Sequence, residues 1–163
     1  MNKPVKTLLL LLTLWLAAPL HAQELVLAIR HAEKQDGPDP ALTEDGRARA
    51  ANWATMLRPV GLDVVITSEA RRTVETGTLI ANALDLPLIS FPANTPSALL
   101  DALEFDHEGD RVLIVGHVET LPGILTALGA PDPVEMTQAQ FDRLFILNAP
   151  NSGAATLNEL RMP

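Results

Sequence analysis

The segment ELVLAIRHAEK, residues 24–34, decides the predicted fold of the chain. Its first part, Glu24 to Ile29, is a short and largely apolar run of the kind found in strands buried on both faces of a parallel sheet. The run stops at Arg30 and His31, two polar side chains that a core would reject. Because open α/β sheets bind ligands beyond the carboxyl ends of their strands, this strand end is a candidate site.

Strand and helix patterns alternate along the rest of the chain. Thr43 is expected to cap a helix that begins with Glu44 and ends before Pro59. Further strands are expected at residues 63–67, 86–91, 111–115, 143–147 and 155–160, and further helices at 70–84, 97–103 and 120–128. Pro87 places the strand at 86–91 near a sheet edge. The pattern predicts an α/β fold, three α/β/α layers around a mainly parallel sheet, with the last two strands pairing.

Within the helix expected at 70–84, the periodicity of the apolar residues predicts which side chains face the core. The inner positions are expected to be Val74, Leu79, Ile80 and Ala83.

Composition narrows the class of protein. The 163 residues suit one domain of ordinary size, and 47% apolar residues can supply a core. A net charge of −8 argues against a general nucleic-acid binder, which needs a basic face. The chain has no cysteine, so a disulfide framework, a thiolate metal site and a cysteine nucleophile are all excluded.

The first 22 residues have the pattern of a secretory signal peptide. Lys3 and Lys6 form a positive amino-terminal region, and Leu8 to Ala18 is an apolar stretch of 11 residues, too short to span a bilayer. Pro19 and the small residue Ala22 suit the cleavage region. We expect cleavage near Gln23, a single domain over residues 23–163, export to the periplasm or beyond, and no stable membrane association after cleavage. An uncleaved anchor is the alternative.

Polar side chains with related chemistry follow three of the expected strands. They are Arg30-His31 after the first, Thr67-Ser68 and then Arg71-Arg72 after the second, and Gly116-His117 after the strand at 111–115. A guanidinium offers a planar set of donors that matches phosphate oxygens, and a neutral imidazole is a competent nucleophile. The joint occurrence at three strand ends predicts a phosphate pocket that carries its own nucleophile.

Ordinary explanations exist for each feature taken singly. Arg71 and Arg72 could belong to an exposed helix face, with Glu69 and Glu75 as ion-pair partners. Two histidines could also bind zinc, although the spacing from His31 to His117 forms no short ligand motif.

Four segments, in this order, resemble the histidine phosphatase superfamily, which has the phosphoglycerate-mutase-like fold. Residues 27–34 resemble its RHG signature, and residues 42–46 its LTxxG segment. Residues 67–76 resemble its SPxxRxxxT segment, and residues 115–122 the block around its second histidine. The resemblance extends over residues 24–160, and the compact layout is similar to that of small bacterial phosphohistidine phosphatases.

The resemblance implies roles for individual residues. His31 would be the nucleophile that accepts the phosphoryl group, while Arg30, Arg72 and His117 would bind and polarise it. The family pattern selects Arg72 rather than its neighbour Arg71. It also implies that no metal or organic cofactor is needed.

The chain departs from the family pattern at several positions. Ala32 replaces a glycine, and Glu69 replaces a proline and brings a negative charge near the pocket rim. Members that keep an acidic residue directly after the second histidine would have it at position 118, which is Val118 here. We expect Glu119 to be the proton donor, because a carboxylate near bound phosphate has a raised pKa. Glu104 and Asp106 are the alternatives.

The sequence therefore predicts an exported phosphatase, independent of metal ions, that hydrolyses a phosphate monoester or a phosphoramidate through a phosphohistidine. Its partner would be a phosphorylated small molecule or macromolecule, and no nucleic acid. A phosphoryl-binding protein of the same fold with little or no turnover is one alternative. A metal-dependent hydrolase is another.

Overall fold

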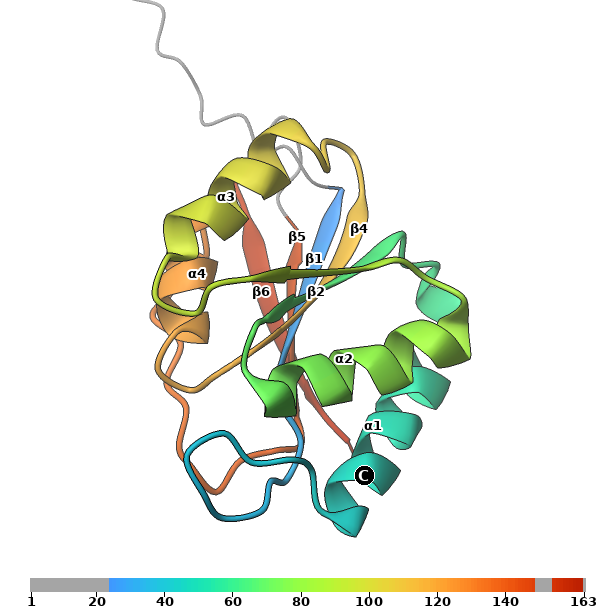
Figure 1. The fold of residues 1–163 in the computed structure, drawn as a ribbon. Helices are drawn as coiled ribbons and strands as arrows, with labels where there is room; N and C mark the ends of the chain where they lie inside the picture. Colours follow the sequence, from blue (N-terminus) through green and yellow to red (C-terminus); the bar gives the residue numbers. More distant parts are fainter. Residues whose placement is uncertain (1–23, 149–153, 163) are drawn as a thin grey trace, which may run out of the picture.

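The computed structural model describes residues 24–148 and 154–162. One six-stranded sheet organises these residues, in the order β3-β2-β4-β1-β5-β6 (Figure 1). The strands are β1 (Leu25–Arg30), β2 (Val64–Ser68), β3 (Leu88–Phe91), β4 (Arg111–Gly116), β5 (Arg143–Asn148) and β6 (Thr156–Arg161). The predicted signal peptide lies outside the described residues.

The sheet is mainly parallel, as predicted. β1 pairs with β4, β4 with β2, and β2 with β3, all in parallel. Only β5 runs against its neighbours, pairing antiparallel with both β1 and β6. The carboxyl ends of β1, β2 and β4 therefore meet at one edge of the sheet, where the polar residues follow.

Helices cover both faces, which confirms the three-layer architecture (Figure 1). They are α1 (Glu44–Leu57), a 3-10 turn η1 (Arg58–Val60), α2 (Arg71–Leu84), α3 (Pro96–Phe105) and α4 (Leu121–Ala127). No helix in the described part of the chain is long and apolar enough to cross a bilayer.

Alternate residues of each central strand feed two separate cores. In β1, Leu27 and Ile29 pack towards α1 and α2, while Val26 and Ala28 pack towards α3 and α4. The continuous apolar runs of β1 and β4 are therefore explained by burial on both faces.

Local signals set the element boundaries. The hydroxyl of Thr43 accepts a hydrogen bond from the backbone N–H of Gly46 at 3.0 Å, which confirms the predicted cap of α1. Pro59 lies in the short 3-10 turn that follows α1. β3 is the edge strand expected from Pro87.

The predicted inner face of the helix at 70–84 is wrong in part. Ile80 is buried as expected, but Ala83 is exposed and Val74 and Leu79 are only half-buried. The buried face of α2 instead consists of Thr73, Thr76, Gly77, Ile80 and Ala81. Two of these residues are buried threonines whose hydroxyls form hydrogen bonds, so apolar periodicity could not select them.

Candidate active site

The pairing of β1 with β4 brings two histidines together. Arg30 is aligned with Gly116, so the next residue of each chain segment is a histidine. The backbone N–H of His31 donates to the carbonyl of Gly116 at 3.0 Å. The rings of His31 and His117 have centroids 5.4 Å apart, and both side chains are buried.

His31 is held in one tautomer. Its Nδ1 lies 2.7 Å from the carbonyl oxygen of Ala32, which can only accept, so Nδ1 carries the proton. Nε2 is then the atom with a free lone pair. Burial and the nearby positive charges of Arg30 and Arg72 lower the pKa of His31 to about 3. The ring is therefore neutral at physiological pH, the form in which it can act as a nucleophile.

His117 is held in the opposite tautomer by a chain of hydroxyls. The Thr73 hydroxyl donates to the carbonyl of Ala70 at 2.7 Å and lies 2.7 Å from the Ser68 hydroxyl, which therefore donates to it. Ser68 is left to accept from Nε2 of His117 at 2.8 Å. Nδ1 of His117 then accepts from Nη2 of Arg72 at 3.3 Å. Burial and the charge of Arg72 lower the pKa of His117 to about 4.

Two arginines at this edge have no acidic partner. Arg30 is only 4% exposed, and no described carboxylate forms an ion pair with it or with Arg72. The Nε atoms of both side chains are buried and lack a hydrogen-bond partner among the described residues. Burial and the charge of Arg72 lower the pKa of Arg30, and the opposing charges of Glu119 and Glu33 offset this only in part. Donors left unpaired in this way are suited to an anionic ligand.

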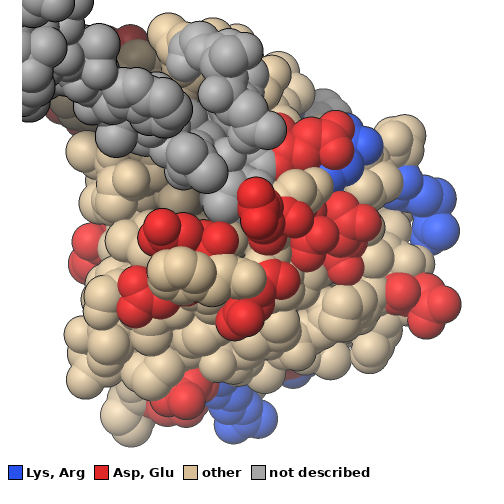
Figure 2. All heavy atoms as spheres, turned by 90° about the horizontal axis from the view of Figure 1, so that it is seen from above, with Lys and Arg blue, Asp and Glu red and all other residues tan. Residues whose placement is uncertain are grey.

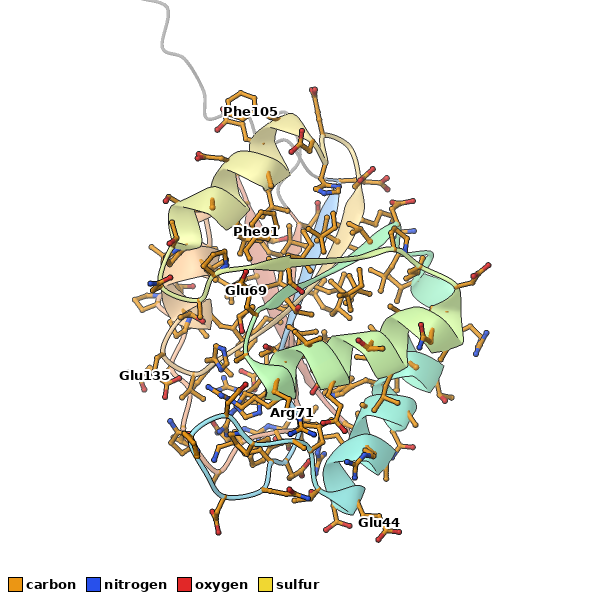
Figure 3. The ribbon with its side chains drawn as sticks, in the orientation of Figure 1. Glu44, Glu69, Arg71, Phe91, Phe105 and Glu135 are labelled. Atoms are coloured by element: carbon orange, nitrogen blue, oxygen red, sulfur yellow. The ribbon has the colours of Figure 1, made fainter. Side chains whose placement is uncertain are left out.

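The structure separates the two adjacent arginines at the start of α2. Arg72 points to His117, whereas Arg71 is exposed (Figure 3). Glu69 is exposed as well, and its side chain lies with Arg71 and Asp39 around an open surface hollow. The side chain selected by the family pattern is therefore the one that reaches the histidines.

Glu119 lies two residues before α4 and is exposed. Its Oε1 accepts a hydrogen bond from Nε2 of Gln138 at 2.6 Å. Burial alone would raise the pKa of this carboxyl, but hydrogen bonds from its own backbone N–H and from Gln138 outweigh burial and lower it. The charge of Arg30 acts in the same direction. Glu119 is thus ionised in the unliganded protein.

The alternative proton donors, Glu104 and Asp106, lie away from the two histidines. Glu104 and Asp106 flank Phe105 at the end of α3, which leads into the beginning of β4. Phe105 lies at the top of the molecule in Figure 3, and Arg71 lies in its lower half. Both carboxylates therefore precede the amino end of β4, whereas His117 follows its carboxyl end.

Two residues of the segment between α4 and β5 also belong to the site, and sequence reasoning missed both. Arg30 donates from Nη1 to the backbone oxygen of Gln138 at 2.5 Å and from Nη2 to its Oε1 at 2.8 Å. The ring of Phe141 lies 4.0 Å from the Arg30 guanidinium carbon. The ring centroid of Phe141 is also 6.1 Å from that of His31. No local pattern marks residues 131–142, because the contacts are more than a hundred residues apart in sequence.

The site lies in an acidic molecule. Figure 2 views the molecule from the end that is uppermost in Figure 1, and Asp and Glu side chains are spread over much of this face. The clustered Arg30 and Arg72 are therefore a local exception to the net charge of −8. Among the described residues, no group of three or more His, Asp and Glu side chains is placed to hold a metal ion.

Comparison with known proteins gives a sequence match and a fold match. The model of the family "Histidine phosphatase superfamily (branch 1)" matches residues 26–93, which include Arg30, His31 and Arg72. No curated protein matches the chain by sequence.

Solved structures resemble the described fold. A protein described as the phosphohistidine phosphatase SixA of Agrobacterium tumefaciens has a TM-score of 0.55 at 20% identity, covering 77% of this chain and 91% of that one. A protein described as an α-ribazole-5′-P phosphatase, from Escherichia coli, has a TM-score of 0.65 at 19% identity, covering 85% and 96%. A mycobacterial glucosyl-3-phosphoglycerate phosphatase, in complex with VO3, has a TM-score of 0.63 at 14% identity, covering 83% and 97%. At these identities the likeness establishes the fold. The resemblance seen in the sequence motifs is confirmed.

Proposed function

We propose that this chain, which resembles the histidine phosphatase superfamily in sequence and in fold, is a phosphatase that works without a metal ion. It would hydrolyse a phosphate monoester or a phosphoramidate through a phosphohistidine on His31. One observation carries the proposal: two arginines without acidic partners lie beside two buried, neutral imidazoles. The family match and the phosphatases among the structural neighbours support phosphatase activity in general.

Arg30, Arg72 and His117 would bind the phosphoryl group, His117 as an N–H donor once the negative charge of the bound group raises its pKa and Nδ1 takes up a proton. The guanidinium groups keep N–H donors free for phosphate oxygens, and each phosphate contact would satisfy a donor that otherwise lacks a partner. These fixed positive groups would also stabilise the charge that spreads over the equatorial oxygens during transfer.

The reaction would proceed in two displacements. Nε2 of His31 attacks phosphorus, the bond from phosphorus to the leaving oxygen or nitrogen breaks, and the leaving atom takes a proton from the Glu119 carboxyl. Water then attacks the phosphohistidine, gives a proton back to Glu119, and releases phosphate with His31 restored. Bound phosphate would oppose the ionised form of Glu119 and supply the protonated carboxyl that the first step needs.

A second function, phosphoryl binding with little turnover, is favoured by the state of Glu119. This carboxyl is ionised and hydrogen-bonded to Gln138 in the unliganded protein, so protonation requires that substrate binding change its surroundings. An aryl phosphate separates the two functions, because its good leaving group needs little help from an acid. Release of phosphate from the aryl ester supports the enzyme, whereas tight phosphate binding without release supports the binding protein.

The nucleophile is tested by His31→Ala. Because His31 follows the end of β1, the variant should stay folded, lose turnover, and lose acid-labile, alkali-stable labelling by a phosphoryl donor. Activity of the unaltered protein should persist in excess chelator. Undiminished labelling of the variant would refute His31 as the phosphate acceptor, and loss of activity in chelator would favour the metal-dependent alternative.

We also propose that the chain is exported to the periplasm after cleavage near residue 22. The proposal rests on the amino-terminal sequence pattern alone. Cell fractionation and amino-terminal sequencing of the mature protein test it. A periplasmic protein starting near Gln23 is expected, and a cytoplasmic protein that keeps Lys3 and Lys6 would refute it.

A further inference from the structure

Gln138 connects two groups to which the proposed mechanism gives different tasks. Its side-chain oxygen accepts from Nη2 of Arg30 at 2.8 Å, and its side-chain nitrogen donates to Oε1 of Glu119 at 2.6 Å. Its backbone oxygen accepts from Nη1 of Arg30 at 2.5 Å. One residue thus contacts both the proposed phosphate ligand and the proposed proton donor.

We propose that Gln138 is a positioning residue that ties Glu119 to Arg30, so that the carboxyl stands beside the leaving atom of a phosphoryl group held by Arg30. This inference rests on the proposed function. It adds to the site a residue from a segment outside the four sequence motifs and outside the family match over residues 26–93.

The contacts leave Arg30 able to bind phosphate. A guanidinium has five N–H donors, and Gln138 takes one from each terminal nitrogen. The remaining donors include the unpartnered Nε. Phe141, 4.0 Å from the guanidinium carbon, stacks on one face of the group. Gln138 and Phe141 therefore fix the orientation of Arg30 and still leave donors for phosphate oxygens.

Gln138 also leaves one carboxylate oxygen of Glu119 free. Gln138 engages Oε1 of Glu119, and no other described side chain holds the Oε2 atom. An amide side chain can accept from a cation and donate to a carboxylate at the same time without changing the charge of the site. Glutamate at this position would lack the donor, and methionine would have a similar length and lack both groups.

The segment has support that does not depend on Gln138. Gln140 accepts at Oε1 from the backbone N–H of Thr137 at 2.9 Å and from Nη1 of Arg143 at 3.1 Å. Arg143 in turn pairs with Glu159 on β6. Changing the side chain of Gln138 should therefore leave the path of the segment in place. Thr137→Ala is a matched control, because Thr137 precedes Gln138, is exposed, and forms no side-chain hydrogen bond with Arg30 or Glu119.

The test compares Gln138→Met, Glu119→Gln and the double variant on two substrates, an alkyl phosphate and an aryl phosphate. If Gln138 acts through Glu119, Gln138→Met should lower kcat for the alkyl phosphate about tenfold, which is a part of the roughly 10²–10⁴-fold that a general acid contributes. The aryl phosphate should lose less than about twofold. The double variant should be no slower on the alkyl phosphate than Glu119→Gln alone, because the two residues serve one step.

The pH profile provides a readout that a merely structural role would not move. Loss of the Gln138 hydrogen bond removes a stabilising contact from the ionised carboxylate, so the pKa of Glu119 should rise. The pH above which kcat for the alkyl phosphate declines should therefore move upward in Gln138→Met and stay in place in Thr137→Ala.

Two results would overturn the inference while leaving the proposed function intact. One is an equal loss on both substrates in Gln138→Met, and the other is a double variant whose losses multiply. An unaltered protein that releases no phosphate from the aryl ester would instead refute the proposed function, and the role of Gln138 with it.

Discussion

At the scale of single residues, hydrogen bonding gives the two histidines opposite tautomers. Nδ1 of His31 is occupied by the carbonyl of Ala32, and Nε2 of His117 is occupied by Ser68. The first arrangement leaves Nε2 of His31 free for attack, and the second leaves Nδ1 of His117 facing Arg72. Two chemically identical side chains can therefore have different tasks because of their neighbours.

Arg72→Ala and Arg71→Ala should differ strongly in activity. Loss of Arg72 removes a partly buried donor from the site and should cost about 2–5 kcal/mol of transition-state binding. Arg71 is exposed, and its loss should cost less than about 0.5 kcal/mol. Values of kcat/KM with an aryl phosphate measure both. A larger loss at Arg71 would show that the wrong arginine has been assigned to the site.

Ser68→Ala should change the tautomer of His117. The variant removes the hydroxyl that accepts from Nε2, so no hydrogen bond then favours the tautomer with the proton on Nε2. Imidazole ¹⁵N NMR should report protonated Nε2 in the parent protein and a mixture in the variant. Thr120→Ala, which removes a hydroxyl that contacts only the backbone of His117, is the control. An unchanged spectrum in Ser68→Ala would contradict the assigned hydrogen-bond chain.

At the scale of elements, α1 and α2 hold the loop that follows β1. The backbone N–H and the hydroxyl of Thr43, at the cap of α1, both donate to the carbonyl of Glu33. Thr76 of α2 accepts from the backbone N–H of Ala32 at 3.1 Å. Arg49 of α1 binds both carboxylate oxygens of Glu33, at 2.8 and 2.9 Å. The loop next to His31 is thus held by both helices of one layer.

Gly46→Ala should destabilise the protein and reduce activity together. A Cβ atom at Gly46 would lie 2.2 Å from the backbone oxygen of Glu33, and this backbone cannot move without shifting the loop next to His31. We expect a loss of about 1–3 kcal/mol in the free energy of unfolding, as overpacking typically causes. Urea denaturation measures it.

Gly123→Ala in α4 is the matched control, because a Cβ there meets nothing within 4 Å. That variant should be unchanged or up to about 1 kcal/mol more stable, since alanine favours helix. Equal destabilisation by the two substitutions would show that the close approach of α1 to Glu33 does not matter.

The sequence allowed the helices and strands to be predicted more fully than the side-chain contacts between them. Caps, prolines and apolar runs depend on neighbouring residues, so the helix starting at Glu44 and the edge strand before Phe91 could be located. The strand-end histidines could be paired because parallel strands share an edge. Gln138 could not be found, because its partners Arg30 and Glu119 are brought to it only by the closed fold.

At the scale of the whole molecule, the site is destabilising in the absence of a ligand. The fold buries two histidines and Arg30 beside the half-buried Arg72, with no ion pair to either arginine among the described residues, in a chain whose net charge is −8. The histidines stay neutral as a result, and their protonation is easier in the unfolded chain. A ligand that supplies negative charge should offset this unfavourable electrostatic energy. Phosphate should therefore raise the free energy of unfolding by an amount that grows with its concentration relative to its Kd.

The free energy of unfolding should therefore fall as the pH is lowered from about 6.5 to about 4. Unfolded histidine has a pKa near 6.5, whereas burial lowers the pKa of His31 to about 3 and that of His117 to about 4. Between these values the unfolded chain binds more protons than the folded one, so stability rises with pH in this window. Each histidine contributes a slope of up to about 1.4 kcal/mol per pH unit. Urea denaturation at pH 7, 6 and 5 should give a shallower slope for His31→Gln and His117→Gln than for the control His107→Gln, whose side chain pairs with Asp110 away from the site. If all three variants kept the parent slope, the two site histidines would not be the groups that resist protonation.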